Sequence, residues 1–198
     1  MDKVEFEQAL RPHYDDALRY CHSLAAKTTH TEAEDLLQES LLKALRKYYQ
    51  LIDKNKFRPW FFQIITRTHL SQARLASLKR MLRISPTATH IPEVYAGYEV
   101  TGQRATILKA LSTLPLKQRA AFLLFELGGF SLEEIRIIQE DKSLSAVKSR
   151  LSRARKKMKE YILELENNKV RTRRESTISD LDYEIHQTTE QALKQLNG

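Results

Sequence analysis

Residues 142–159 read K-S-L-S-A-V-K-S-R-L-S-R-A-R-K-K-M-K and contain eight basic residues and no acidic residue. Apolar residues recur in this stretch at helical spacing, at Val147, Leu151, Ala154 and Met158. The pattern predicts a helix that packs on one side and meets phosphates on the other. A merely solvated charged helix is the alternative, but a surface helix without any acid forgoes the charge pairs that usually stabilise it.

The preceding residues predict a shorter helix and a turn. Ser131 and Glu134 have the spacing of a capping box, and the polar residues 140–142 separate the two helical segments. A short helix, a turn and a basic helix form a helix-turn-helix, which binds duplex DNA in the major groove. If Ser143 caps the second helix, the side chains opposite its apolar stripe are the candidates for that groove: Ser145, Lys148, Ser149, Ser152, Arg153 and Lys156.

Two further arginines, Arg150 and Arg155, lie off the centre of this face. Long cations beside a groove-reading face commonly bind the DNA backbone. We therefore expect them to contact phosphates.

Composition favours an all-α protein. The chain has 198 residues, 41% of them apolar, with only five Gly and five Pro, and its net charge of +8 points to a polyanionic partner. The charge is uneven: residues 1–39 hold nine acids against four bases, whereas residues 54–83 hold eight bases and no acid. The chain therefore carries two separate basic surfaces, the first preceded by an acidic one.

One cysteine, Cys21, excludes an internal disulfide and fits a reducing compartment. No apolar run has the length of a membrane span, and the charged N-terminus lacks the apolar core of a signal peptide. We expect a cytoplasmic protein without membrane insertion.

Helical periodicity predicts two small helical domains joined by a flexible linker, with a helical extension at the C-terminus. We expect a helical bundle over residues 1–84, a linker over 85–103 and a helix-turn-helix domain over 104–166. The linker holds four of the ten Pro and Gly residues. Residues 167–198 contain a short amphipathic pattern, which predicts either a helix that needs a partner or a frayed tail.

The first domain has two apolar stripes and one acidic helical face. We expect Trp60 and Phe61 in its core, together with a stripe formed by Leu36, Leu37, Leu41, Leu42 and Leu45. Asp35, Gln38 and Glu39 lie at i, i+3 and i+4. Such a face is suited to a basic protein surface.

Catalysis has little support. His13, Cys21, His22 and His30 do not reach one helical face, so no metal site is expected. Gly128 and Gly129 lack the pattern of a phosphate-binding loop. We expect no enzyme activity, no cofactor and no metal.

Four strings of the chain occur in a telling order: D-L-L-Q-E at 35–39, F-R-P-W-F-F-Q-I-I at 57–65, L-P at 114–115 followed by Arg119, and V-K-S-R-L-S-R-A-R at 147–155. With them the chain resembles the extracytoplasmic-function sigma factors of bacterial RNA polymerase. Each string is modest evidence alone, but four in order across two domains are specific.

The resemblance implies a role for each surface. Asp35, Gln38 and Glu39 match the helix that binds the clamp coiled coil in the largest subunit of core polymerase. Lys148, Ser149, Ser152 and Arg153 match positions that read the −35 element as duplex DNA. The melted −10 strand is expected at Lys54, Asn55, Lys56, Phe57, Arg58, Gln63, Arg67, Ser71 and Arg74.

Within the −10 set, Phe57 is expected to stack on an extruded base. Arg67 and Ser71 stand where many members of the family have Asn and Asp, so the −10 preference is expected to be unusual. An anti-sigma partner is implied by resemblance alone.

Two other readings remain. A stand-alone helix-turn-helix regulator would bind operator DNA without polymerase and use the N-terminal domain for a protein partner, which leaves the acid-free residues 54–83 without a task. A structural or interaction protein with solvated charged faces would show no salt-sensitive nucleic-acid binding.

Overall fold

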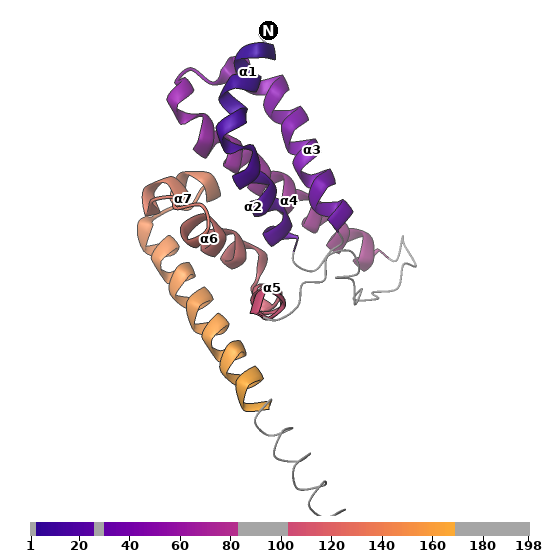
Figure 1. Ribbon diagram of the computed structural model, residues 1–198, viewed down its shortest axis with the longest axis vertical. Helices are drawn as coiled ribbons and strands as arrows, with labels where there is room; N and C mark the ends of the chain where they lie inside the picture. The colour runs from indigo at the N-terminus through magenta and orange to yellow at the C-terminus, as the bar shows by residue number, and fades with distance from the viewer. Residues whose placement is uncertain (1–2, 26–29, 83–102, 169–198) are drawn as a thin grey trace, which may run out of the picture. The chain divides into compact units, whose positions relative to one another are not determined.

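The computed structural model describes residues 3–25, 30–82 and 103–168 (Figure 1). Over these residues the regular structure is helical throughout, without a strand, which confirms the expected all-α class. The linker expected over 85–103, except for residue 103, and the amphipathic segment within 167–198, except for residues 167 and 168, lie outside them. Two compact units divide the chain, Met1–Met158 and Lys159–Gly198, and the packing described below belongs to the first.

The N-terminal helices follow one another with short connections. Their bounds are α1 Lys3–Leu10, η1 Arg11–His13, α2 Tyr14–Leu24, α3 His30–Lys47, η2 Tyr48–Gln50, η3 Lys54–Lys56 and α4 Phe57–Met81. Pro59 lies in the first turn of α4, where its missing N–H breaks no hydrogen bond. The 25-residue helix α4 packs against α1, α2 and α3 and is the central element of this part.

Large side chains fill the core between α2, α3 and α4. Tyr20, Leu36, Phe61 and Ile65 are each at most 1% exposed. The Tyr20 hydroxyl lies 2.9 Å from Thr66 Oγ1, so its polar end is satisfied inside the core. The core position of Phe61 is as expected, while Trp60 is only half-buried.

One member of the expected leucine stripe was assigned wrongly. Leu36 and Leu37 are buried, but Leu42 is 55% exposed. The run of leucines in α3 is wider than the side that faces α2 and α4, so a leucine at its edge remains on the surface.

The C-terminal helices of the first unit are α5 Gln103–Thr113, α6 Leu116–Glu126, α7 Leu132–Gln139 and a helix that begins at residue 144, whose helical residues continue to 168. The expected apolar stripe of that last helix is confirmed, because Val147, Leu151, Ala154 and Met158 are all buried. The capping box of Ser131 and Glu134 at the start of α7 is also confirmed.

The turn before α7 requires glycine. A Cβ on Gly128 would lie 2.7 Å from the ring of Phe130 and 2.8 Å from the carbonyl oxygen of Leu124, and Gly129 has a φ of +62°. The close approach brings Phe130, which is 2% exposed, onto Phe62 of α4 at a ring distance of 4.9 Å. The glycine pair thus sets the contact between α4 and the helix-turn-helix.

A buried arginine joins α2, α5 and α6. Arg119 is 2% exposed, and its guanidinium donates to the carbonyl oxygens of Leu24 at 2.7 Å and Leu111 at 2.9 Å. It also donates to the carbonyls of Ser112 and Leu114. Because a guanidinium has five N–H donors in a rigid fork, it can satisfy several helix-end carbonyls at once.

A partly buried histidine makes stability depend on pH. Burial, with a smaller contribution from Arg119, lowers the pKa of His69 to about 4, and its Nε2 has no hydrogen-bond partner. The folded pKa lies below the unfolded value near 6.5, so this contribution to stability is present above pH 6.5 and is lost as pH falls through 4. We expect a loss of about 3 kcal/mol over that window.

The measurement is urea unfolding at pH 7 and pH 4 for the wild type and His69→Leu. The variant is expected to lose less stability than the wild type, since other titrating groups are common to both. Equal losses would contradict the assignment to His69.

Candidate nucleic-acid and protein interfaces

The acidic face of α3 is exposed as the sequence predicts. Asp35 and Gln38 are exposed, whereas Glu39 is partly covered. Gln72 Nε2 donates to Glu39 Oε2 at 2.6 Å, and Lys43 Nζ lies 2.6 Å from Glu39 Oε1. The hydrogen bond from Lys43 lowers the pKa of Glu39 and so favours its charged form.

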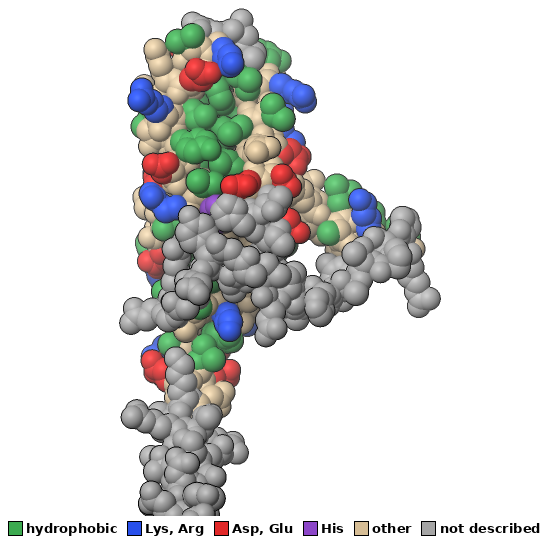
Figure 2. All heavy atoms as spheres, turned by 45° about the vertical axis from the view of Figure 1, so that its right-hand side comes forward, with side chains coloured by type: hydrophobic (Ala, Val, Ile, Leu, Met, Phe, Trp, Pro, Cys, Tyr) green, Lys and Arg blue, Asp and Glu red, His purple; other side chains and the backbone are tan. Residues whose placement is uncertain are grey.

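Exposed apolar side chains follow the acidic residues, near the C-terminal end of α3 and in η2. Leu42 is 55% exposed one turn after the acidic residues, and Tyr49 in η2 is 71% exposed. Figure 2 shows apolar side chains gathered at the upper end of its visible face, with basic and acidic side chains at the edges. A surface that combines acids with exposed apolar groups is typical of a protein-binding face.

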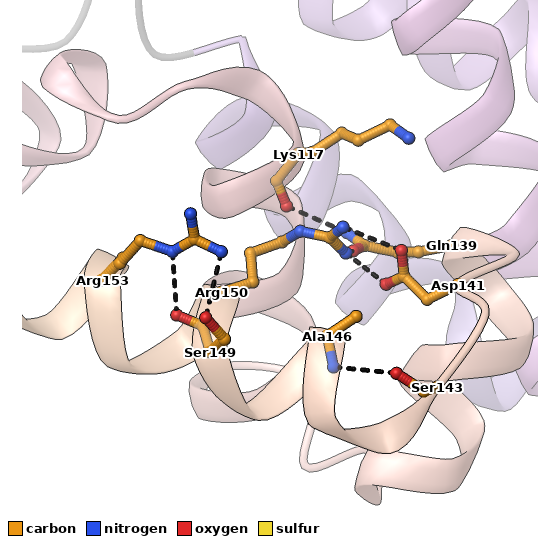
Figure 3. A network of polar contacts seen from close by, with 8 residues as sticks. All are labelled: Lys117, Gln139, Asp141, Ser143, Ala146, Ser149, Arg150 and Arg153. Carbon is orange, nitrogen blue, oxygen red and sulfur yellow. Dashed lines mark hydrogen bonds and ion pairs between the residues drawn. The ribbon is translucent and has the colours of Figure 1, made fainter.

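The basic helix begins as expected, at an N-cap formed by Ser143. The backbone N–H of Ala146 donates to Ser143 Oγ at 3.2 Å (Figure 3). All six candidates for the major groove are exposed: Ser145, Lys148, Ser149, Ser152, Arg153 and Lys156. Arg153 donates to the hydroxyl and carbonyl of Ser149 at 3.0 and 3.2 Å, so the two form a paired group on the groove face.

Arg150 has a structural role, which corrects its expected contact with phosphate. Its guanidinium points into the turn, where it pairs with both carboxylate oxygens of Asp141 and donates to Gln139 (Figure 3). Arg150 and Asp141 are 15% and 7% exposed in their side chains. Gln139 in turn donates to the carbonyl of Lys117 at 3.1 Å, so this network fixes the turn on α6.

Arg155 remains half exposed. It donates to Glu126 at 2.8 and 3.0 Å, and its guanidinium carbon lies 5.0 Å from the ring centre of Phe125. An exposed ion pair of this kind is weak, so a DNA phosphate can displace the carboxylate.

The loop expected to hold the melted strand presents cations, but not Phe57. Lys54, Asn55 and Lys56 are exposed in η3, and Asn55 N–H donates to the side chain of Asp53 at 3.1 Å. Phe57 is 3% exposed and packs on Phe6, at a ring distance of 5.8 Å, as part of the aromatic core. The expectation that Phe57 stacks on an extruded base is therefore wrong.

Two exposed side chains of the same region were missed by sequence reasoning. Ile52 is 98% exposed and Tyr49 is 71% exposed, on either side of buried Leu51. An isoleucine among polar loop residues is the signal that could have identified an apolar contact surface, since an apolar side chain that does not pack inside is available to a ligand.

The expected −10 residues of α4 divide into two groups. Ser71 and Arg74 are exposed, whereas Arg58, Gln63 and Arg67 contact residues 128–140. Arg58 donates to the carbonyl of Gly128, Gln63 Nε2 donates to the carbonyl of Ile137 at 3.1 Å, and Arg67 pairs with Glu140. The structure therefore places part of the expected single-strand surface against the helix-turn-helix.

Two family profiles match this chain. The profile "Sigma-70 region 2" matches residues 9–78, and the profile "Sigma-70, region 4" matches residues 104–158. A sigma factor of Mycobacterium tuberculosis, ECF RNA polymerase sigma factor SigM, is 30% identical over 163 residues, which cover 79% of this chain and 76% of that protein. The chain belongs to the extracytoplasmic-function sigma factors.

Further relatives agree with this family. ECF RNA polymerase sigma factor SigE of Mycolicibacterium smegmatis is 28% identical over 161 residues, and the match spans 61% of its length. Among solved structures, the sigma factor RpoE of Bartonella quintana, crystallised with the anti-sigma factor NepR, is 29% identical with a TM-score of 0.63 and covers 79% of this chain and 96% of that one. The residues of this chain that the two family profiles match include the acidic face, the aromatic helix α4 and the helix-turn-helix.

The residues that the structure describes lack two other kinds of site. None of their helices is long and apolar enough to cross a membrane. In the same residues, no group of three or more His, Cys, Asp or Glu side chains is arranged to hold a metal ion.

Proposed function

We propose that this sigma factor confers promoter specificity on bacterial core RNA polymerase by holding three partners with three separate surfaces. The protein itself carries out no catalysis and acts in the cytoplasm, where polymerase and promoters are found. The family membership and the exposed basic helix carry the proposal. Binding two DNA elements through one tethered protein raises effective concentration, so each contact can be weak.

The polymerase surface is the face of Asp35, Gln38 and Glu39. Its charge complements a basic surface such as the clamp coiled coil, and neighbouring Leu42 supplies exposed apolar area. The Lys43 and Gln72 contacts hold Glu39 in one orientation before the partner arrives. This preorganisation lowers the entropic cost of binding.

The −35 surface is the exposed face of the basic helix. Lys148, Ser149, Ser152 and Arg153 would read base edges, with Ser145, Lys156 and Arg155 near the backbone. The Arg150 network positions this helix on the turn. Arg150 therefore acts on recognition through the orientation of the helix.

The −10 surface comprises the η3 cations, the exposed side of α4 and, in place of Phe57, the apolar side chains of Tyr49 and Ile52. Lys54, Asn55 and Lys56 would bind the strand, and Arg74 and Ser71 would extend the track along α4. Arg58, Gln63 and Arg67 would join it by exchanging their contacts with residues 128–140 for contacts with DNA. Binding of the −10 strand thus favours separation of α4 from the helix-turn-helix.

An anti-sigma factor is a further proposed partner. The support is the structural relative RpoE, which was crystallised with the anti-sigma factor NepR.

Arg153→Ala tests the −35 assignment. If Arg153 makes a bidentate contact to a base, the variant should lose about 1–3 kcal/mol of binding on sequences that carry that base and less on the others. The measurement is holoenzyme binding to a library of −35 variants. A uniform loss across the library would reassign Arg153 to a phosphate contact.

Gel shifts separate this function from the stand-alone regulator. Genomic fragments are incubated with the chain alone, with core polymerase alone and with both. A sigma subunit is expected to produce specific complexes only with core. Specific shifts by the chain alone, unchanged by core, would favour the regulator.

A further inference from the structure

A basic cavity lies between α3 and α4, beside the expected −10 residues. Its volume is about 240 Å³, and its lining is Lys43, Lys47, Ile64, Arg67, Thr68 and Ser71. The cavity is open to solvent on one side, and that volume has room for a phosphate group. Lys47 belongs to none of the surfaces proposed above, and Lys43 has a role there only through its ion pair with Glu39.

The lining suits an anion. Three cations and two hydroxyls line it, and no acidic side chain does. Lys43 Nζ donates to Thr68 Oγ1 at 3.3 Å, which directs it toward the cavity side of α4, although Glu39 competes for the same ammonium at 2.6 Å. Lys47 is exposed and has no ion-pair partner within the described part of the chain. Charge-assisted hydrogen bonds from such groups are the usual way proteins hold phosphate.

One of these cations, Arg67, already forms an ion pair with a carboxylate. Glu140 pairs with Arg67, and Glu140 sits at the end of α7 with a φ of 54° and a ψ of 43°, in the left-handed region. That conformation is unfavourable for a side chain other than Gly, Asn or Asp, by about 1 kcal/mol or more. The strained position aims an anionic group at the cavity's arginine.

We propose that the cavity binds one backbone phosphate of the melted DNA strand, through Lys43, Lys47 and Arg67, and that Glu140 takes the place of this phosphate on Arg67 when DNA is absent. The inference rests on the proposed function and extends it to two new contact residues. Single-stranded DNA is the occupant that the position favours, because Arg67 and Ser71 line both the cavity and the exposed −10 side of α4.

The strength of the ion pair between Glu140 and Arg67 decides how easily a phosphate displaces Glu140. Arg67 and Glu140 keep 52% and 62% of their side-chain surface exposed. An exposed pair contributes only about 0.2–1 kcal/mol, so removing the carboxylate should change affinity by no more than about fivefold. Glu140 therefore tunes binding without blocking it.

The test measures binding of the full chain to a fluorescein-labelled oligonucleotide of about fifteen thymidines. Fluorescence anisotropy is the readout, and the titration is repeated at a series of salt concentrations. Lys47→Gln should weaken binding about fivefold or more and lower the slope of log affinity against log salt by about 0.7, the value for one phosphate on a single strand. Lys109→Gln is the matched control, since Lys109 is an exposed lysine of α5 outside every surface proposed here.

The Glu140 part has its own control. Glu140→Gln should raise affinity about two- to fivefold, whereas Glu133→Gln, which removes an exposed acid elsewhere on α7, should raise it less. With Arg67→Gln already present, Glu140→Gln should have no further effect, because the two act through one contact. Thermal melts check that each variant is folded.

Several outcomes would overturn the inference. Equal effects of Lys47→Gln and Lys109→Gln would remove the phosphate site, as would a lack of binding by Glu140→Gln at low salt. Equal losses on a duplex of the same length would show a site for any DNA phosphate and overturn the choice of single strand. None of these results bears on promoter-dependent transcription, which is tested separately, so the inference can fail while the proposed function stands.

Discussion

Replacing Asp35 and Glu39 with lysine is expected to abolish binding to core polymerase. Each reversal turns an attraction into a repulsion at the same interface, and close charge pairs couple by about 1.5–7 kcal/mol, so the double variant should lose about a hundredfold or more in affinity. Asp35 is exposed and Glu39 partly so, and the core beneath them is formed by Leu36 and Leu37. The fold should therefore survive the change.

The measurement is a titration of labelled chain with core polymerase. A matched control is Glu7→Lys with Asp15→Lys, which makes the same change in net charge on α1 and α2. The control should bind as the wild type does at moderate salt, where distant charges are screened. Retained binding by the α3 variant, or equal loss in both, would remove the clamp-binding assignment.

Arg119→Ala is expected to have the largest effect on stability. The guanidinium satisfies carbonyls of Leu24, Leu111, Ser112 and Leu114 inside the protein, and its removal leaves buried acceptors without donors. We expect a loss of about 3–5 kcal/mol, since each unsatisfied buried group costs about 1–3 kcal/mol and water can reach some of them. The melting temperature should fall by roughly 10 °C or more.

Differential scanning calorimetry of Arg119→Ala beside Arg46→Ala provides the comparison, since Arg46 is exposed on α3. The melting temperature of Arg119→Lys should lie between those of the two variants, because a lysine keeps the charge but has three donors with a different geometry. If Arg119→Ala and Arg46→Ala had the same melting temperature, the carbonyls around Arg119 would have to be satisfied by other groups.

Helical periodicity and capping signals predicted the local structure of the helix-turn-helix well. The buried stripe of Val147, Leu151, Ala154 and Met158, together with the Ser143 cap, agrees with the spacing of the sequence. These features depend on neighbours within one or two helical turns, which sequence patterns record directly. Helical spacing also accounts for the exposure of Asp35.

The errors concern residues whose roles depend on distant partners. Phe57 looks like a loop aromatic, yet its ring lies 5.8 Å from that of Phe6, some fifty residues away. Arg150 lies in a run of cations, but Asp141 and Gln139 across the turn bind its guanidinium. Neither partner could be inferred from helical spacing, because the tertiary contact that decides the role lies outside the motif.

The contact of α4 with residues 128–140 was equally hidden. The sequence was tested at Gly128 and Gly129 only for a phosphate-binding loop, but the missing side chain at Gly128 lets Phe130 pack on Phe62. The sequence alone carried no sign that Arg67 would pair with Glu140. That pair connects the two proposed DNA-binding surfaces within one compact unit.

The most direct test of promoter specificity is run-off transcription from genomic fragments by purified bacterial core polymerase, with and without this sigma factor. New transcripts of discrete length that require the chain, and that disappear with the Asp35→Lys and Glu39→Lys variant, are the predicted result. An active core that gives the same transcripts with and without the chain would contradict the account.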